Sequence, residues 1–112
     1  MKSSRELSEL LVQLKLTALA PDFSKDSLIF ALESLLLWLN NSQNNTDSNC
    51  KEIDYFISFE ILPEKRFEDI PENIRNILFD MGATLHDAHT SPELARNFES
   101  MPNQLLNRLR GL

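Results

Sequence analysis

The chain has 112 residues, close to the commonest size of a single domain, and its 42% hydrophobic and 25% charged residues are typical of a globular protein. A net charge of −6 opposes binding to phosphate groups, which argues against a nucleic-acid-binding protein. The presence of only two glycines disfavours a fold of many tight hairpins, and a single cysteine, Cys50, cannot form an internal disulfide. We therefore expect residues 1–112 to form one helical domain.

The first predicted element is an amphipathic helix at the N-terminus. Ser3 and Glu6 have the spacing of a capping box, in which each side chain bonds the backbone of the other. The leucines that follow recur at helical intervals, so this helix should run to about Leu19. Pro21 cannot continue a helix and should end it.

A second helix is predicted over residues 28–39, with Ser24 or Asp26 as its N-cap. Its apolar residues cover nearly every side, which is typical of a helix enclosed by others. We expect it to be the centre of a compact bundle. Its apolar run is about 12 residues long, whereas a membrane crossing takes about 20.

The middle of the chain is less clear from its pattern. Residues 40–51 are polar and poor in apolar side chains, so we expect a long mobile loop there. In residues 52–62 the apolar side chains alternate as in a strand, but several of them also fit a helix. Because no other segment reads as a strand, we expect a helix. The alternative is an α+β fold with one strand near residues 53–61.

An acidic elbow over residues 63–70 should precede the clearest helix of the sequence. Asp69 and Glu72 have capping-box spacing, and apolar residues then recur at helical intervals as far as Leu85.

The C-terminal part contains two similar sequences, at residues 90–93 and 100–103, in which a serine is followed closely by a proline. Both are typical of helix starts, so we expect two short helices at the end of the chain. The sequence as a whole predicts an all-α bundle of about five to six helices.

The strongest candidate for chemistry is a pair of histidines, His86 and His89, near the end of the fourth predicted helix. Together with Asp80 or Asp87 they could share a metal ion, but their faces are expected to diverge, and a zinc site takes three or four ligands. The His86-Asp87 doublet resembles that of the metal-dependent phosphohydrolases named for it. That family also needs an upstream histidine and a downstream aspartate, which this chain lacks.

We therefore predict no catalytic residue, no metal and no cofactor. The two histidines are interpreted as polar residues that suit the negative end of the helix dipole.

The excess negative charge is concentrated in one part of the chain. Residues 52–80 hold eight acidic and three basic side chains, whereas the flanking segments are nearly neutral. The same span contains aromatic residues that could anchor a partner while the carboxylates attract it. The predicted partner-binding residues are Asp54, Tyr55, Glu60, Glu64, Phe67, Glu68, Asp69 and Glu72.

A small, acidic, helical chain with such a span resembles the bacterial immunity proteins that neutralise nuclease toxins of the colicin and contact-dependent growth-inhibition systems. The resemblance is one of type, because it rests on size, charge and helicity and on no shared motif. It implies a non-enzymatic toxin inhibitor whose carboxylates face a basic toxin surface, with a nuclease as the expected toxin. It implies no direct contact with nucleic acid or membrane.

Two other functions remain open from the sequence. The chain could be a dimeric regulatory adaptor or subunit in which the surface around Tyr55 pairs with its own copy. It could also be a metal-dependent hydrolase that uses His86 and His89. The N-terminal residues have no apolar stretch of the kind a secretory signal requires, so we expect a cytoplasmic protein.

Overall fold

The computed structural model describes residues 2–22, 24–41, 43–91, 93 and 96–112, without the side chains of residues 2–4 and 96–99. Over these residues the chain forms five α-helices and no strand, which confirms the expected all-α bundle. The elements in chain order are α1 (Lys2–Ala18), α2 (Lys25–Leu39), α3 (Asp47–Phe56), the π-helical turn η1 (Ile57–Ile61), the 3-10 helix η2 (Lys65–Asp69), α4 (Glu72–Thr90) and α5 (Arg96–Arg110).

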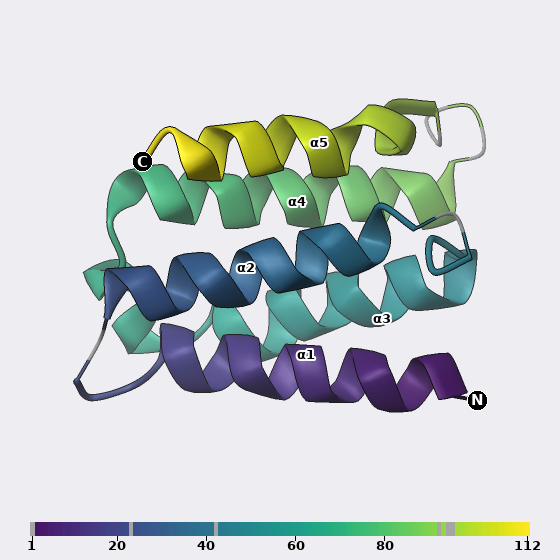
Figure 1. Ribbon diagram of the computed structural model, residues 1–112. Helices are drawn as coiled ribbons and strands as arrows, with labels where there is room; N and C mark the ends of the chain where they lie inside the picture. Colours follow the sequence, from purple (N-terminus) through teal and green to yellow (C-terminus); the bar gives the residue numbers. More distant parts are fainter. Residues whose placement is uncertain (1, 23, 42, 92, 94–95) are drawn as a thin grey trace.

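The five α-helices form a closed ring in which each one packs against two neighbours. α2 packs between α1 and α5, and α4 packs on the other side of α5 (Figure 1). α3 packs against both α4 and α1 and so closes the ring. The Cα radius of gyration is 13.1 Å, close to the value of about 13 Å expected for a compact chain of this length. Residues far apart in sequence on α3 and α4 are thereby brought side by side.

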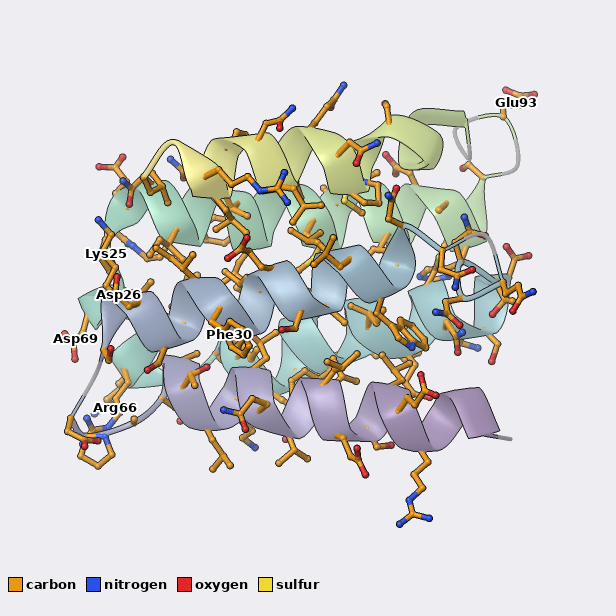
Figure 2. The ribbon with its side chains drawn as sticks, in the orientation of Figure 1. Lys25, Asp26, Phe30, Arg66, Asp69 and Glu93 are labelled. Atoms are coloured by element: carbon orange, nitrogen blue, oxygen red, sulfur yellow. The ribbon has the colours of Figure 1, made fainter. Side chains whose placement is uncertain are left out.

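The core is one cluster of buried apolar side chains to which all five helices contribute. Six residues of α2 are buried in it: Leu28, Ala31, Leu32, Leu35, Leu36 and Leu39. Phe30 (Figure 2) and Leu37 of the same helix are exposed, so α2 presents apolar side chains to solvent and is not enclosed by the other helices. No helix in the described ranges is both long enough and apolar enough to cross a bilayer.

The predicted loop at residues 40–51 is wrong in its second half, because α3 begins at Asp47. Thr46 caps this helix by accepting a hydrogen bond from the backbone N–H of Asn49 at 3.2 Å. Asn49 and Cys50 are buried, and the Asn49 side chain donates to the Asn44 carbonyl at 2.8 Å. The polar composition gave no sign of this helical turn, because its inward residues are the small Cys50 and the polar Asn49, whose side chain is hydrogen-bonded within the chain.

Residues 52–61 are helical, in α3 and η1, so the alternative of a strand near residues 53–61 is wrong. Ile53, Ile57 and Ile61 recur every fourth residue and are fully buried, whereas Tyr55 and Phe59 lie on the exposed side. The apparent alternation therefore combines an inward aliphatic stripe with an outward aromatic one.

The expected helix starts fare differently. α1 begins at Lys2, one residue before the Ser3 that was expected to cap it. Ser24 caps α2, as predicted, and accepts a hydrogen bond from the backbone N–H three residues later. The prediction of Asp69 as a cap is wrong: Pro71 occupies the N-cap position of α4, and Asp69 ends the preceding 3-10 helix.

The expected helix start at residues 100–103 is also wrong, because α5 runs without interruption through Pro102. Proline cannot donate the backbone hydrogen bond of a helix interior, which weakens α5 locally. The apolar face on both sides of Pro102 is buried, with Met101 before it and Leu105 and Leu109 after it in the core, and this packing keeps the chain helical. In the other expected start, Thr90 ends α4 and Pro92 lies outside the described residues.

Candidate functional site

A shallow groove of about 400 Å³ runs between α1 and the segment formed by α3 and η1. We call it the α1–α3 groove. Its lining residues are Ser8, Leu11 and Val12 from α1, Glu52, Tyr55 and Phe56 from α3, and Phe59 and Glu60 from η1.

The α1–α3 groove exposes large apolar side chains. Phe59 is 69% exposed, Val12 54% and Tyr55 45%. Tyr55 and Phe59 are four residues apart and therefore project from the same side of the helical segment, where their rings meet edge to face at 5.8 Å. Leu16, one helical turn after Val12, is also exposed. A contiguous exposed apolar surface of this kind is typical of interaction sites.

Carboxylates border this apolar surface. Glu52 and Glu60 both line the groove and are both exposed. Glu60 accepts a hydrogen bond of 2.7 Å from the Lys15 ammonium, which raises the pKa of Lys15 above its ordinary value, and Glu64 acts in the same direction. Glu60 is thus partly neutralised by the chain itself.

The eight predicted partner-binding residues divide into exposed and buried ones. Asp54 and Phe67 are buried, so neither is presented outward as predicted: Asp54 lies against α4, and the Phe67 ring packs on Phe79 with centroids 5.4 Å apart. The other six are exposed: Tyr55, Glu60, Glu64, Glu68, Asp69 and Glu72.

The exposed acidic residues do not form one continuous surface. Glu60 borders the α1–α3 groove, whereas Asp69 lies at the end of the bundle together with Asp26 (Figure 2). The basic residues Lys25 and Arg66 lie at that same end, so its charge is mixed (Figure 2). The groove, rather than the acidic elbow, combines exposed aromatic rings with carboxylates.

A second candidate is a cluster of three side chains between α3 and α4. Oδ2 of Asp54 lies 3.1 Å from Nδ1 of His86 and 2.8 Å from Nε2 of His89. The Ser58 hydroxyl donates to the other carboxylate oxygen at 3.4 Å. The side chains of Asp54 and His89 are 6% and 7% exposed, whereas that of His86 is 60% exposed. A buried carboxylate is costly unless it has such partners.

The carboxylates predicted to accompany these histidines, Asp80 and Asp87, are not the one that lies beside them. Asp80 pairs with Arg108 on α5, and the third member of the cluster is Asp54, which is 32 residues before His86. His86 and His89 lie on one face of α4 and meet a single oxygen atom, so the expectation that their faces diverge is wrong. The burial of Asp54 could have been suspected from the sequence, because Asp54 follows Ile53 and lies at the edge of the buried stripe of α3.

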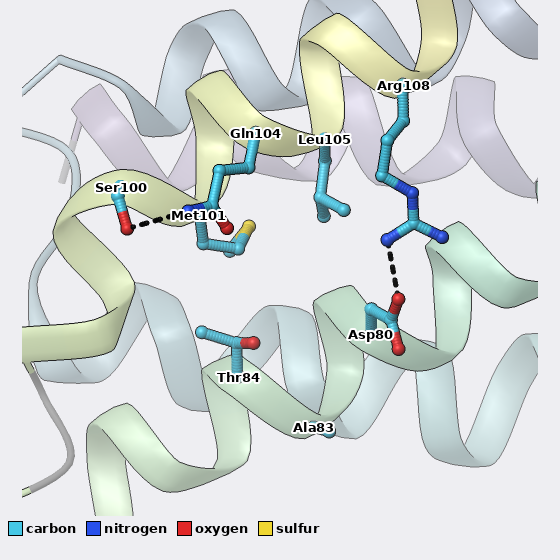
Figure 3. A pocket seen from close by; sticks show the side chains of 8 residues that line it. All are labelled: Asp80, Ala83, Thr84, Ser100, Met101, Gln104, Leu105 and Arg108. Carbon is cyan, nitrogen blue, oxygen red and sulfur yellow. Dashed lines mark hydrogen bonds and ion pairs between the residues drawn. The ribbon is translucent and has the colours of Figure 1, made fainter.

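A cavity of about 360 Å³ between α4 and α5 is a weaker candidate (Figure 3). Arg108 pairs with Asp80 across it, and the Gln104 side-chain amide donates to the Ser100 hydroxyl at 3.4 Å. These four groups form two pairs, so the charged groups and the Gln104 amide nitrogen of the cavity are already engaged with each other.

Comparison with known proteins identifies no protein family, no curated protein and no solved structure that matches this chain. The function therefore has to be argued from the geometry.

Proposed function

We propose that this protein is an immunity protein that neutralises a cognate toxin by binding it through the α1–α3 groove. The toxin that we propose is a nuclease. The observation that carries the proposal is the exposure of Val12, Tyr55 and Phe59 beside two carboxylates. Binding energy in protein interfaces is concentrated in a few large, buried anchors, and aromatic residues are prominent among them. Phe59 and Tyr55 are the anchors that this surface offers.

The carboxylates of the groove favour a basic partner, Glu52 more than Glu60, because Glu60 is already bonded to Lys15. Glu52 and Glu60 lie beside the apolar residues, and the whole chain carries a net charge of −6. A nuclease is basic where it holds phosphate groups, so the negative charge of this chain attracts that surface and speeds association. The partner-binding residues proposed from the groove are Val12, Glu52, Tyr55, Phe59 and Glu60.

Pairing of the groove with a second copy of the chain is the rival function, and exposure of Tyr55 and Phe59 also favours it. In a two-fold dimer the same patch faces itself, so Glu52 and Glu60 of each copy would approach the carboxylates of the other. That repulsion favours a different, basic partner. A monomer in sedimentation at micromolar concentration agrees with toxin binding, and a stable dimer supports the rival.

The proposal predicts that a gene beside that of this chain encodes the toxin, and it is tested with the toxin domain of that gene's product. The two are co-purified, and their dissociation constant is measured over a range of salt concentrations. We expect a complex that weakens as salt rises, because rim charges are screened. The double variant Glu52→Gln/Glu60→Gln should associate more slowly and show a smaller dependence on salt.

The matched control is Asp22→Asn/Asp26→Asn, which removes two exposed carboxylates outside the groove and makes the net charge less negative by the same amount. It should retain most of the association rate. Equal effects of the two double variants would show that only net charge matters and would refute the groove as the binding surface.

A further inference from the structure

The Asp54–His86–His89 cluster brings three metal-ligating atoms from two helices to one point. Oδ2 of Asp54, Nδ1 of His86 and Nε2 of His89 all lie within 4.8 Å of one another. His86 and His89 are three residues apart on α4 and therefore share a face, and the packing of α3 on α4 sets Asp54 opposite them.

We propose that this cluster binds one divalent transition-metal ion of the zinc class and thereby ties α3 to α4. Imidazole nitrogen and carboxylate oxygen are both ordinary ligands of zinc. Zinc–ligand bonds of about 2.0–2.1 Å in a tetrahedron separate neighbouring ligand atoms by about 3.3 Å. The separations of 3.1 Å and 2.8 Å from Asp54 to the two imidazoles are a few tenths of an ångström shorter than this value. The two imidazole nitrogens lie within 4.8 Å of each other, so a side-chain rotation that moves them together by at most about 1.5 Å completes the site, and the exposed His86 side chain has room for it.

The surroundings of the cluster suit a bound ion. The second oxygen of Asp54 accepts a hydrogen bond from Ser58, and such outer contacts hold a ligating carboxylate in place. The Tyr55 ring meets His89 edge to face at 5.9 Å and restricts its movement. The imidazoles of His86 and His89 themselves meet edge to face at 5.4 Å.

One of the three proposed ligands, His86, is exposed, and this gives an ion access to the cluster. Asp54 and His89 are nearly inaccessible, whereas the His86 side chain is 60% exposed. An ion can therefore enter from the side of His86, and water can occupy a fourth position there. The metal would then join α3 and α4 at the point where the side chains of Asp54, His86 and His89 already meet.

The competing account of the same atoms is a hydrogen-bonded cluster in which both imidazoles donate to Asp54. The two accounts differ in what fills the space between the three atoms, protons or one metal ion. Only the metal account predicts saturable, stoichiometric binding of an added ion that depends on all three side chains.

The test uses the full chain purified without a histidine tag and treated with a chelator. Zn²⁺ is added in a calorimetric titration, and Co²⁺ is added in parallel as a coloured substitute. We expect one ion per chain, visible absorption bands from bound Co²⁺, and a higher melting temperature with Zn²⁺ than with chelator. His86 and His89 are the only histidines in the sequence, so imidazole NMR signals report on this cluster alone.

His86→Gln is the main variant, because this exposed side chain can be replaced with little risk to the fold. Loss of an outer-sphere partner alone weakens metal binding by about 10–100-fold, so loss of a ligand should weaken it at least that much. Asp87→Asn is the matched control, since it removes the adjacent carboxylate of α4 that is outside the cluster.

We expect Asp87→Asn to bind Zn²⁺ as the parent chain does, and circular dichroism verifies that both variants are folded. Absence of saturable binding by the parent chain would overturn the proposal and leave the hydrogen-bonded cluster. Retained affinity in His86→Gln, or an equal loss in Asp87→Asn, would overturn it as well.

Discussion

Replacing Phe59 with alanine is the perturbation that probes the α1–α3 groove most strongly. A phenylalanine side chain offers roughly 200 Å² for burial, so its 69% exposure leaves roughly 140 Å² for a partner to cover. At about 25 cal/mol per Å² this corresponds to at most about 3.5 kcal/mol. Incomplete coverage and the remaining methyl group reduce the expected loss to about 2 kcal/mol, which is roughly a 30-fold weaker complex.

The chain supplies a closely matched control for this variant. Phe30 on α2 is 68% exposed and does not line the groove, so Phe30→Ala removes the same apolar area elsewhere. The dissociation constants of both variants are measured by calorimetry with the toxin domain, after a melting curve has verified each fold. We expect Phe30→Ala to change affinity by less than about twofold. A loss on Phe30→Ala that equals or exceeds the loss on Phe59→Ala would refute the assignment of the groove.

Three further predictions concern the fold itself. Burial raises the pKa of the Cys50 thiol to about 11, with Asp47 adding to the shift, so a thiol reagent at pH 8 should label the native chain far more slowly than the urea-unfolded chain. Because the pKa of Cys50 is raised on folding, the contribution of this thiol to stability is complete below about pH 9 and is lost as the pH rises toward 11. Urea unfolding at several pH values measures this loss. Leu35→Ala empties part of the core and should lower the free energy of unfolding by about 2–5 kcal/mol in urea titrations, and a loss below about 1 kcal/mol would contradict its burial. Thr46→Ala removes the N-cap of α3 and should cost about 1 kcal/mol in the same titrations, whereas no change would argue against a helix that begins at Asp47.

The helices that could be predicted from the sequence are those whose burial follows a simple period. Leu7, Leu11 and Leu14 of α1 recur at helical spacing and are all buried. Ser24 has the residue type and the position of an N-cap, so the start of α2 was also readable.

The errors arise where long-range packing determines the local structure. The first turn of α3 has almost no apolar side chain, and it becomes helical because Asn49 and Cys50 are covered by the rest of the bundle. Pro102 signals a helix start by local rules, but the buried residues on both sides of it hold α5 together. Such contacts cannot be read from a window of the sequence.

The candidate sites were predictable only in part. Acidic and aromatic residues are concentrated around Tyr55 and Glu60, and this composition correctly indicated that these two side chains are exposed. Composition does not distinguish exposed from buried aromatic residues, so it gave no indication that Phe67 is in the core. Asp54 was expected on the outside because it is charged. Its burial depends on His86 and His89, which come close only when α3 packs on α4.

The central claim is that the α1–α3 groove contacts a basic protein partner, and chemical-shift mapping tests it most directly. The isotopically labelled chain is titrated with the unlabelled toxin domain, and backbone amide signals are followed to saturation. Our account predicts that the largest shifts and line broadening occur around Val12, Tyr55 and Phe59. Shifts that are instead concentrated on the exposed face of α2 around Phe30 and Leu37, with the groove unchanged, would contradict it.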